Sequence, residues 1–263
     1  MNDLIGQHAI ITGGGSGIGL ACARTFLRDG ASVTLLGRTQ STLEQAITTL
    51  NDDLPARSGE VRCSVADITD EQALADAIAN AHRRLPITLA VANAGTGAAS
   101  PFLQTTSEQW DQVIQTNLNG TFYTLKHAGQ AIAESGGGAL CAISSIAGLR
   151  THKFMSAYCT SKAAVDMLVR NAADELGALN VRVNSVCPGL VETDLSQGLT
   201  QNKHMREDYL ACMPLSRTGM VQDIAQAVRY LCGPEASWVT GVTLPVDGGH
   251  HLRRRPNLER LSD

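Results

Sequence analysis

Short apolar runs alternate with longer amphipathic stretches along almost the whole chain of 263 residues. The runs have the length and composition of buried strands, and the stretches between them can carry helical crossovers between parallel strands. The expected strands are Ala9–Thr12, Ser32–Leu36, Glu60–Val65, Leu89–Asn93, Gly138–Ser144, Val181–Cys187 and Val242–Val246. This order predicts an α/β fold with a doubly wound, seven-stranded parallel sheet and helices on both faces. Neither repeats nor low-complexity linkers interrupt it, so we expect a single domain over residues 1–263.

One segment departs from this alternation. Residues 192–219 are too many for an ordinary connection between elements. Its larger apolar residues are Leu195, Leu199, Met205, Tyr209 and Met213. We therefore expect a mobile substrate lid at about residues 190–219.

The tail of residues 250–263 begins with His250 and His251 and continues into three arginines. Adjacent strand residues face opposite ways, and no further ligand cluster accompanies the two histidines, so we expect no metal site. We expect a solvated tail or one that packs on a neighbouring subunit, and a role in holding an anionic substrate is the alternative.

Composition narrows the class of protein. The formal net charge is −4, so neither a nucleic acid nor a membrane surface is an expected partner. The chain opens without a secretory signal pattern and contains no apolar run of membrane-spanning length, so we expect a cytoplasmic protein. Seven scattered cysteines without a C-x-x-C motif indicate reduced thiols rather than a disulfide framework or a zinc site.

A glycine-rich stretch follows the first expected strand. Gly13-Gly-Gly-Ser-Gly17-Ile-Gly19 separates Ala9–Thr12 from a helical pattern that opens at Leu20. Glycines allow a tight turn and let a helix N-terminus approach a pyrophosphate, whose charge the backbone amides stabilise. The order of strand, loop and helix predicts a dinucleotide site.

The second expected strand ends in Gly37-Arg38-Thr39, without the carboxylate that usually binds the ribose 2′-hydroxyl of NAD. A guanidinium at this point can hold a 2′-phosphate through two hydrogen bonds. The sequence therefore favours NADP(H). In the alternative, Arg38 stacks on the adenine and NAD(H) is also accepted.

Tyr158 and Lys162 lie four residues apart in a segment, Ala157–Gly177, whose apolar spacing predicts a helix. Four residues place both side chains on one helix face. A cation beside a phenol favours the phenolate, so we expect Lys162 to lower the pKa of Tyr158. Such a tyrosine can exchange a proton with a substrate oxygen.

These motifs together resemble the compact, single-domain branch of the short-chain dehydrogenase/reductase family, in particular its 3-oxoacyl reductase-like and hydroxysteroid dehydrogenase-like members. The similarity runs from about His8 to Gly249. The matching positions are Thr12, Gly13, Gly17 and Gly19 in the loop, Asp67, Asn93-Ala94-Gly95, Asn117, Ser145, Tyr158, Lys162, Pro188-Gly189 and Val246-Asp-Gly-Gly249.

The resemblance implies an NAD(P)-binding Rossmann-type domain with a catalytic set of Asn117, Ser145, Tyr158 and Lys162. Ser145 lies thirteen residues before Tyr158, as in the family, and is chosen over Ser144. The expected cofactor-binding residues are Gly13, Gly15, Ser16, Gly17, Ile18, Gly19, Arg38, Thr39, Asp67, Ile68, Asn93, Ala94, Gly95, Tyr158, Lys162, Pro188, Gly189, Val191 and Thr193.

Each catalytic residue receives a role from the resemblance. Ser145 stabilises charge on the substrate oxygen, Lys162 tunes Tyr158 and holds the nicotinamide ribose, and Asn117 binds a water that connects Lys162 to solvent. An ordinary structural role is the alternative for Asn117, whose side chain could simply bond within a helix kink.

We therefore expect an NADP(H)-dependent oxidoreductase that interconverts a carbonyl and a secondary alcohol of a small molecule. A 3-oxoacyl-thioester reductase is the main alternative, in which Arg150, His152 and Lys153 could face a phosphopantetheine. The second alternative function is a non-catalytic protein that senses the cofactor. The family usually pairs through the helix of the catalytic tyrosine, and Met167 and Leu168 on that helix favour a homotetramer, with a homodimer as the alternative.

Overall fold

The structure is a computed structural model that describes residues 4–54 and 59–252. The arginines and the end of the expected tail, residues 253–263, lie outside the described part of the chain.

Seven strands form one sheet in which every neighbouring pair is parallel. The strands are β1 His8–Thr12, β2 Ser32–Gly37, β3 Val61–Val65, β4 Leu89–Ala92, β5 Gly138–Ile143, β6 Val181–Pro188 and β7 Thr243–Val246. Their order in space is β3-β2-β1-β4-β5-β6-β7. The order reverses between β1 and β4, where the two halves of a doubly wound sheet leave a crevice at the carboxyl ends of the strands. The predicted fold class is confirmed.

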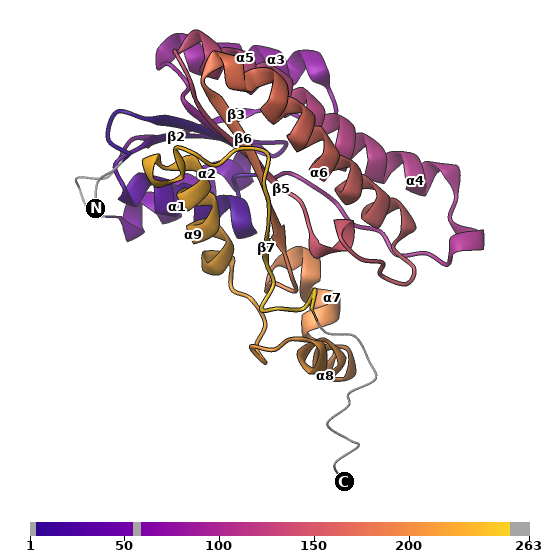
Figure 1. The fold of residues 1–263 in the computed structure, drawn as a ribbon. Coiled ribbons are helices and arrows are strands. Elements are labelled where there is room, and N and C mark those ends of the chain that lie inside the picture. Colours follow the sequence, from indigo (N-terminus) through magenta and orange to yellow (C-terminus); the bar gives the residue numbers. More distant parts are fainter. Residues whose placement is uncertain (1–3, 55–58, 253–263) are drawn as a thin grey trace.

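Helices cover both faces of this sheet (Figure 1). The helices that accompany the sheet are α1 Gly17–Arg28, α2 Gln40–Asp53, α3 Glu71–Arg84, α4 Ser107–Ile114, α5 Gly120–Glu134, α6 Ser156–Leu176 and α9 Val221–Cys232. The helix predicted from Ala157 to Gly177 is α6, shifted by one residue.

Successive side chains along the strands point to opposite faces of the sheet and contribute to two separate hydrophobic cores. Ile11 and Leu35 pack with helices α1, α2 and α9 on one face. Their neighbours Ile10 and Leu36 point the other way and pack with α3, α5 and α6. All four side chains are fully buried, and each contributes about 1.5–3 kcal/mol by leaving water. The central parallel strands are mostly apolar because both faces of the sheet are covered.

The segment expected to be a lid contains two short helices, α7 Gln197–Thr200 and α8 Lys203–Cys212. Hydrogen bonds join its two ends. The amide of Glu192 donates to the Gly219 carbonyl at 3.0 Å, and the amide of Gly219 donates to the Leu190 carbonyl at 2.8 Å. The Thr218 hydroxyl donates to Glu192 Oε1 at 2.6 Å. The lid is therefore a closed loop with a paired base, and its mobility stays a prediction.

In the described residues, no helix combines the length and the apolar character needed to cross a membrane.

Candidate active site

A cavity of about 620 Å³ opens at the carboxyl ends of the strands. It brings together most of the residues that the sequence indicated. The predicted residues that line it are Gly13, Ser16, Gly17, Ile18, Arg38, Asp67, Ile68, Asn93, Ala94, Gly95, Ser145, Tyr158, Lys162, Pro188, Gly189, Val191 and Thr193. Four others, Gly15, Gly19, Thr39 and Asn117, are not on its wall.

The loop between β1 and α1 is packed too closely for side chains at two of its glycines. Gly13 has φ +63°, and a Cβ there would lie 2.8 Å from Asn93 Nδ2. A Cβ on Gly19 would overlap the carbonyl oxygen of Gly13. Gly19 therefore shapes the site by allowing α1 to approach the loop, although it does not line the cavity.

Gly15 and Thr39 contribute at the back of the loop. A Cβ on Gly15 would lie 3.0 Å from Thr42 Cγ2 of α2, so this glycine lets the loop pack on α2. Thr39 is the N-cap position of α2. Both residues support the wall from outside the cavity.

Asn93 ties the nucleotide loop to the neighbouring strand. Its Nδ2 donates to the carbonyl oxygens of Thr12 and Gly13 at 3.0 and 3.1 Å. In return, the Thr12 hydroxyl accepts from the amides of Asn93 and Ala94. These bonds fix the ends of β1 and β4 against each other at the reversal of strand order.

The start of α1 has the features of a phosphate site. Ser16 is its N-cap but makes no side-chain capping bond, so the first amides of the helix face the cavity without an internal acceptor. An anion is stabilised at such a position by these amides and by the helix dipole.

Arg38 extends the same wall at the end of β2, with Asp67 and Ile68 beyond β3. The Arg38 side chain is exposed, so its guanidinium is accessible to a ligand. Asp67 Oδ1 already accepts from the amide and hydroxyl of Thr69, which fixes the orientation of its carboxylate. The residues that would hold an adenosine and its phosphate thus lie on one continuous wall.

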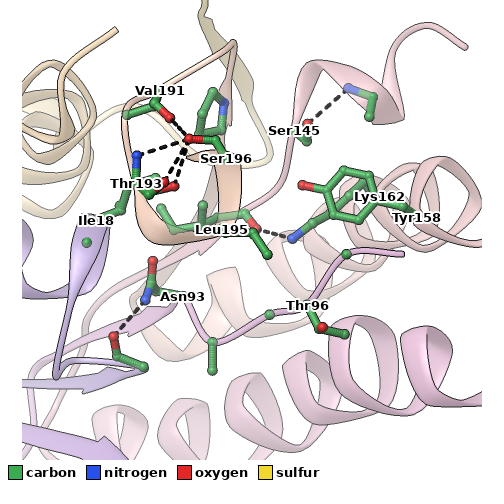
Figure 2. Close-up of a pocket in the computed structure, with 18 of the residues that line it drawn as sticks. Ile18, Asn93, Thr96, Ser145, Tyr158, Lys162, Val191, Thr193, Leu195 and Ser196 are labelled. Atoms are coloured by element: carbon green, nitrogen blue, oxygen red, sulfur yellow. Dashed lines mark hydrogen bonds between the residues drawn. The ribbon is translucent and has the colours of Figure 1, made fainter. Parts of the chain in front are cut away.

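Ser145, Tyr158 and Lys162 meet on the opposite wall (Figure 2). Lys162 Nζ lies 5.7 Å from the centre of the Tyr158 ring and donates to the Ile143 carbonyl at 2.8 Å. Ser145 Oγ accepts from the Ala147 amide at 3.1 Å. The strand end of β5 and the first turns of α6 therefore place the three groups together.

The ionisation of this pair differs from the expectation. Burial raises the pKa of Tyr158, and a hydrogen bond with Ser145 only partly opposes this. Burial also lowers the pKa of Lys162 to about 8, while the negative charge of Asp166 pulls it upward. The pKa of Tyr158 is therefore raised, whereas the sequence predicted that Lys162 would lower it. The reason is that burial disfavours both charged forms.

Asn117 sits in a π-helical turn, Gln115–Asn119, between α4 and α5. Its side chain is fully buried and bonds to the backbone of Thr96 through both polar atoms, at 2.8 and 2.9 Å. A Cβ on Gly95 would lie 3.2 Å from Asn117 Oδ1 and 3.7 Å from Lys162 Nζ. Asn117 therefore lies behind the cavity wall and next to Lys162, where it fixes the segment after β4 that carries Gly95 and Thr96.

Asp166 is a buried carboxylate that the sequence argument overlooked. It is 3% exposed and lies one helical turn after Lys162. Its Oδ1 accepts from the Ser185 hydroxyl at 3.0 Å, and the Cys187 thiol lies 3.8 Å from both carboxylate oxygens. Burial raises the pKa of Asp166 against these hydrogen bonds. The four-residue spacing between Lys162 and Asp166 could have indicated from the sequence that the two side chains are neighbours on the helix.

The lid supplies part of the cavity wall. Leu195, Leu199 and Tyr209 line it, whereas Met205 does not, and Met213 is fully buried. Figure 2 shows Leu195 across the cavity from Tyr158 and Lys162. Ser196 closes the first turn of the lid, since its hydroxyl lies 2.5 Å from the Val191 carbonyl and accepts from the Thr193 amide at 3.0 Å.

Further lining residues carry no sequence motif of their own. They include Thr96, Gly97, Ala98 and Ala99 after β4, and His152 and Met155 before α6. Only the fold brings them together. The seven cysteines are free thiols, and residues 4–54 and 59–252 contain no group of three His, Cys, Asp or Glu side chains suited to a metal ion.

Comparison with known proteins places the chain in a family. Residues 13–251 match the family described as enoyl-(acyl carrier protein) reductase. Galactitol 2-dehydrogenase (L-tagatose-forming) of Cereibacter sphaeroides is 36% identical over 94% of this chain and 96% of the relative. 3-Oxoacyl-[acyl-carrier-protein] reductase of Chlamydia muridarum is 30% identical over 94% of this chain and 98% of the relative.

A solved structure agrees with these sequence matches. A short-chain type dehydrogenase/reductase from Mycobacterium ulcerans superposes with a TM-score of 0.93 at 40% identity, covering 98% of this chain and 94% of that one. The fold, the cavity and these relatives agree, and the chain belongs to the short-chain dehydrogenase/reductase family of NAD(P)-dependent oxidoreductases acting on CH–OH groups.

Proposed function

We propose that this protein is an NADP(H)-dependent oxidoreductase that interconverts a carbonyl and a secondary alcohol, with Tyr158 as the general acid and base. The observation that carries the proposal is the shared cavity. One wall presents the α1 N-terminus and Arg38, and the other presents Ser145, Tyr158 and Lys162.

In this proposal the bound nicotinamide supplies or accepts the hydride. Tyr158 protonates the substrate oxygen during reduction, and Ser145 donates a hydrogen bond to that oxygen as charge develops on it. Burial raises the pKa of Tyr158 and keeps the phenol neutral, which is the form that reduction needs. Lys162 holds the ribose and supplies positive charge beside the phenol when oxidation requires the phenolate.

The preference for NADP(H) rests on Arg38, which is exposed at the cavity wall. A planar guanidinium can bind a 2′-phosphate in a bidentate manner. NAD(H) remains the alternative cofactor.

The relatives do not define one substrate class, since their names include a polyol dehydrogenase and a 3-oxoacyl-thioester reductase. For the thioester alternative, Arg150 is less suited than expected because its Nη1 donates to the His250 carbonyl at 2.7 Å. The four-residue spacing of Tyr158 and Lys162 disfavours the double-bond reduction named in the family description. A non-catalytic sensor is disfavoured because Ser145, Tyr158 and Lys162 all stand at the cavity.

Replacing Tyr158 by Phe tests the proposed role. Turnover of a ketone with NADPH should fall by at least ~100-fold, because a positioned acid typically contributes ~10²–10⁴-fold, while NADPH binding stays nearly unchanged. The exposed Tyr230 on α9 offers a matched control, and Tyr230→Phe should keep full activity. Near-normal turnover of Tyr158→Phe would contradict the role of Tyr158 as the general acid and base.

We also propose a homotetramer built on two-fold axes. Met167 on the outer side of α6 is 51% exposed, as a pairing surface requires, whereas Leu168 packs partly against the core and contributes less than expected. Light scattering across a dilution series tests the assembly, and a monomer of 27.8 kDa at every concentration would contradict it.

A further inference from the structure

Three aromatic rings gather beside the catalytic residues, and the proposed mechanism uses none of them. His152 belongs to the segment before α6, Tyr209 to α8 of the lid, and His250 to the turn after β7. The rings of His152 and Tyr209 stack at 6.5 Å between centroids. The His250 ring stands edge-on to both, at 6.2 and 5.4 Å.

This cluster is held rigidly at its base. His250 is 3% exposed, and its carbonyl accepts the 2.7 Å bond from Arg150. Asp247 accepts from the amide and ring of His251 next to it. His152 and Tyr209 are therefore positioned by a buried third ring, and both of them line the cavity that contains Tyr158.

The two lining rings differ from their surroundings in polarity. The neighbouring wall is built from Ala98, Ala99, Met155 and Leu199, none of which offers a hydrogen-bonding side chain. Ser196 also lines it, but its hydroxyl is engaged within its own turn. His152 and Tyr209 are thus polar side chains that the cavity wall presents to a substrate in addition to these apolar residues.

The surroundings of both imidazoles favour the neutral form. Burial and the nearby charge of Arg150 lower the pKa of His152, and the same causes lower the pKa of His250 to about 4. Nδ1 of each ring is buried and finds no hydrogen-bond partner within residues 4–54 and 59–252. A neutral imidazole offers one donor and one acceptor, and a phenol offers the same pair. Both match a hydroxyl group, which also donates and accepts.

We propose that His152 and Tyr209 form a polar subsite that binds a hydroxyl group on the carbon skeleton of the substrate. The substrate class is then a hydroxylated ketone and the corresponding polyol, rather than a plain lipophilic ketone or an anionic oxoacid. The inference rests on the proposed carbonyl–alcohol activity and names the substrate class of that site.

Matched four-carbon substrates test the subsite. Erythrulose, which is too short to close a stable sugar ring, is compared with 2-butanone and with the anionic 2-oxobutanoate, using NADPH. We expect kcat/KM for erythrulose to exceed that for the other two by at least ~10-fold, the order expected for one to two hydrogen bonds. His152→Phe keeps a flat ring to stack on Tyr209, and it should bring the ratio of kcat/KM for erythrulose to that for 2-butanone close to one. Tyr209→Phe should lower the ratio in part.

Lys153→Gln is the matched control, because Lys153 is exposed in the same segment and does not line the cavity. It should leave the ratio unchanged. A ratio near one in the parent protein, a preference for 2-oxobutanoate, or a ratio that survives His152→Phe would each overturn the subsite.

A binding measurement separates this inference from the proposed activity. Calorimetric titration of the protein–NADP⁺ complex with erythritol and with 2-butanol should show tighter binding of erythritol by about tenfold, and His152→Phe should abolish that difference. Equal binding of the two alcohols overturns the subsite whatever the turnover. Absence of turnover with every ketone, together with selective binding of erythritol, overturns the proposed activity and supports the subsite.

Discussion

The nucleotide loop of residues 13–19 and the lid of residues 190–219 line the same cavity and differ in how closely they are packed. In the loop, Gly13 and Gly19 lie so near their neighbours that a single methyl group would collide. In the lid, Leu195 is 64% exposed, and Gly198 has no described atom within 4 Å of its Cβ position. The nucleotide loop has to fit a diphosphate, which is the same in every dinucleotide, so a single backbone conformation suffices. The lid faces substrates, which differ from enzyme to enzyme and are contacted by side chains.

The strongest test of this contrast is one substitution made in both regions. Gly19→Ala should weaken NADPH binding by roughly 100-fold, because small displacements of a positioning element are costly, and should destabilise the fold by about 1–3 kcal/mol through overpacking. Gly198→Ala should leave binding unchanged and stabilise the fold by about 0.4–1 kcal/mol through the unfolded state.

Fluorescence titration with NADPH and thermal unfolding measure these two effects. Equal responses of the two variants would show that the loop is no more constrained than the lid.

A second test asks whether cofactor choice belongs to the nucleotide wall alone. Arg38→Asp should change the ratio of NADPH to NADH affinity by roughly 100-fold, since two charge-assisted hydrogen bonds are lost and a carboxylate for the ribose is gained. Arg38→Lys keeps the charge without the planar fork and should give a smaller change.

Titration of both cofactors against the parent and both variants measures the ratio. A parent protein that already prefers NADH would contradict the role of Arg38.

The third test concerns the catalytic wall between loop and lid and has the smallest effect. Asp166 pulls the pKa of Lys162 up from the value that burial alone would give, so that it stands at about 8. Asp166→Asn should therefore lower it further. The ammonium is then lost at lower pH, and any limb of the pH–rate profile that reports Lys162 should move to lower pH.

Nitrogen NMR of Lys162 measures this shift without relying on turnover. Ser185→Ala removes one hydrogen bond to Asp166 and keeps its charge, so it should leave the Lys162 pKa nearly in place. If the pKa of Lys162 is unchanged in Asp166→Asn, Asp166 has only a structural role.

The sequence predicted the sheet well because parallel strands buried on both faces form short, mostly apolar runs. It also located Gly13, Ser145 and Tyr158, which belong to ordered motifs at strand ends or on one helix. It failed for cavity residues that belong to no motif, such as Thr96 and Met155. Of the residues expected in the lid, Tyr209 lines the cavity, whereas Met213 turns into the core.

The ionisation of Tyr158 was misjudged for a related reason. The spacing to Lys162 was visible in the sequence, but the burial of both groups was not, and burial raises the pKa of Tyr158 and lowers the pKa of Lys162. Asp166 was missed although its spacing to Lys162 is the same as that of Tyr158, because a carboxylate in a helix is usually solvated.

The paired base of the lid has a consequence for how proteins of this architecture diversify. Backbone bonds from Leu190 and Glu192 to Gly219 join the two ends of the segment, so its closure does not depend on the residues in between. The entropy of closing such a loop grows only slowly with its length. The residues between these two ends can therefore change in length and sequence without opening the segment. The sheet and the nucleotide-binding loop would keep their shape, while the range of accepted substrates would change.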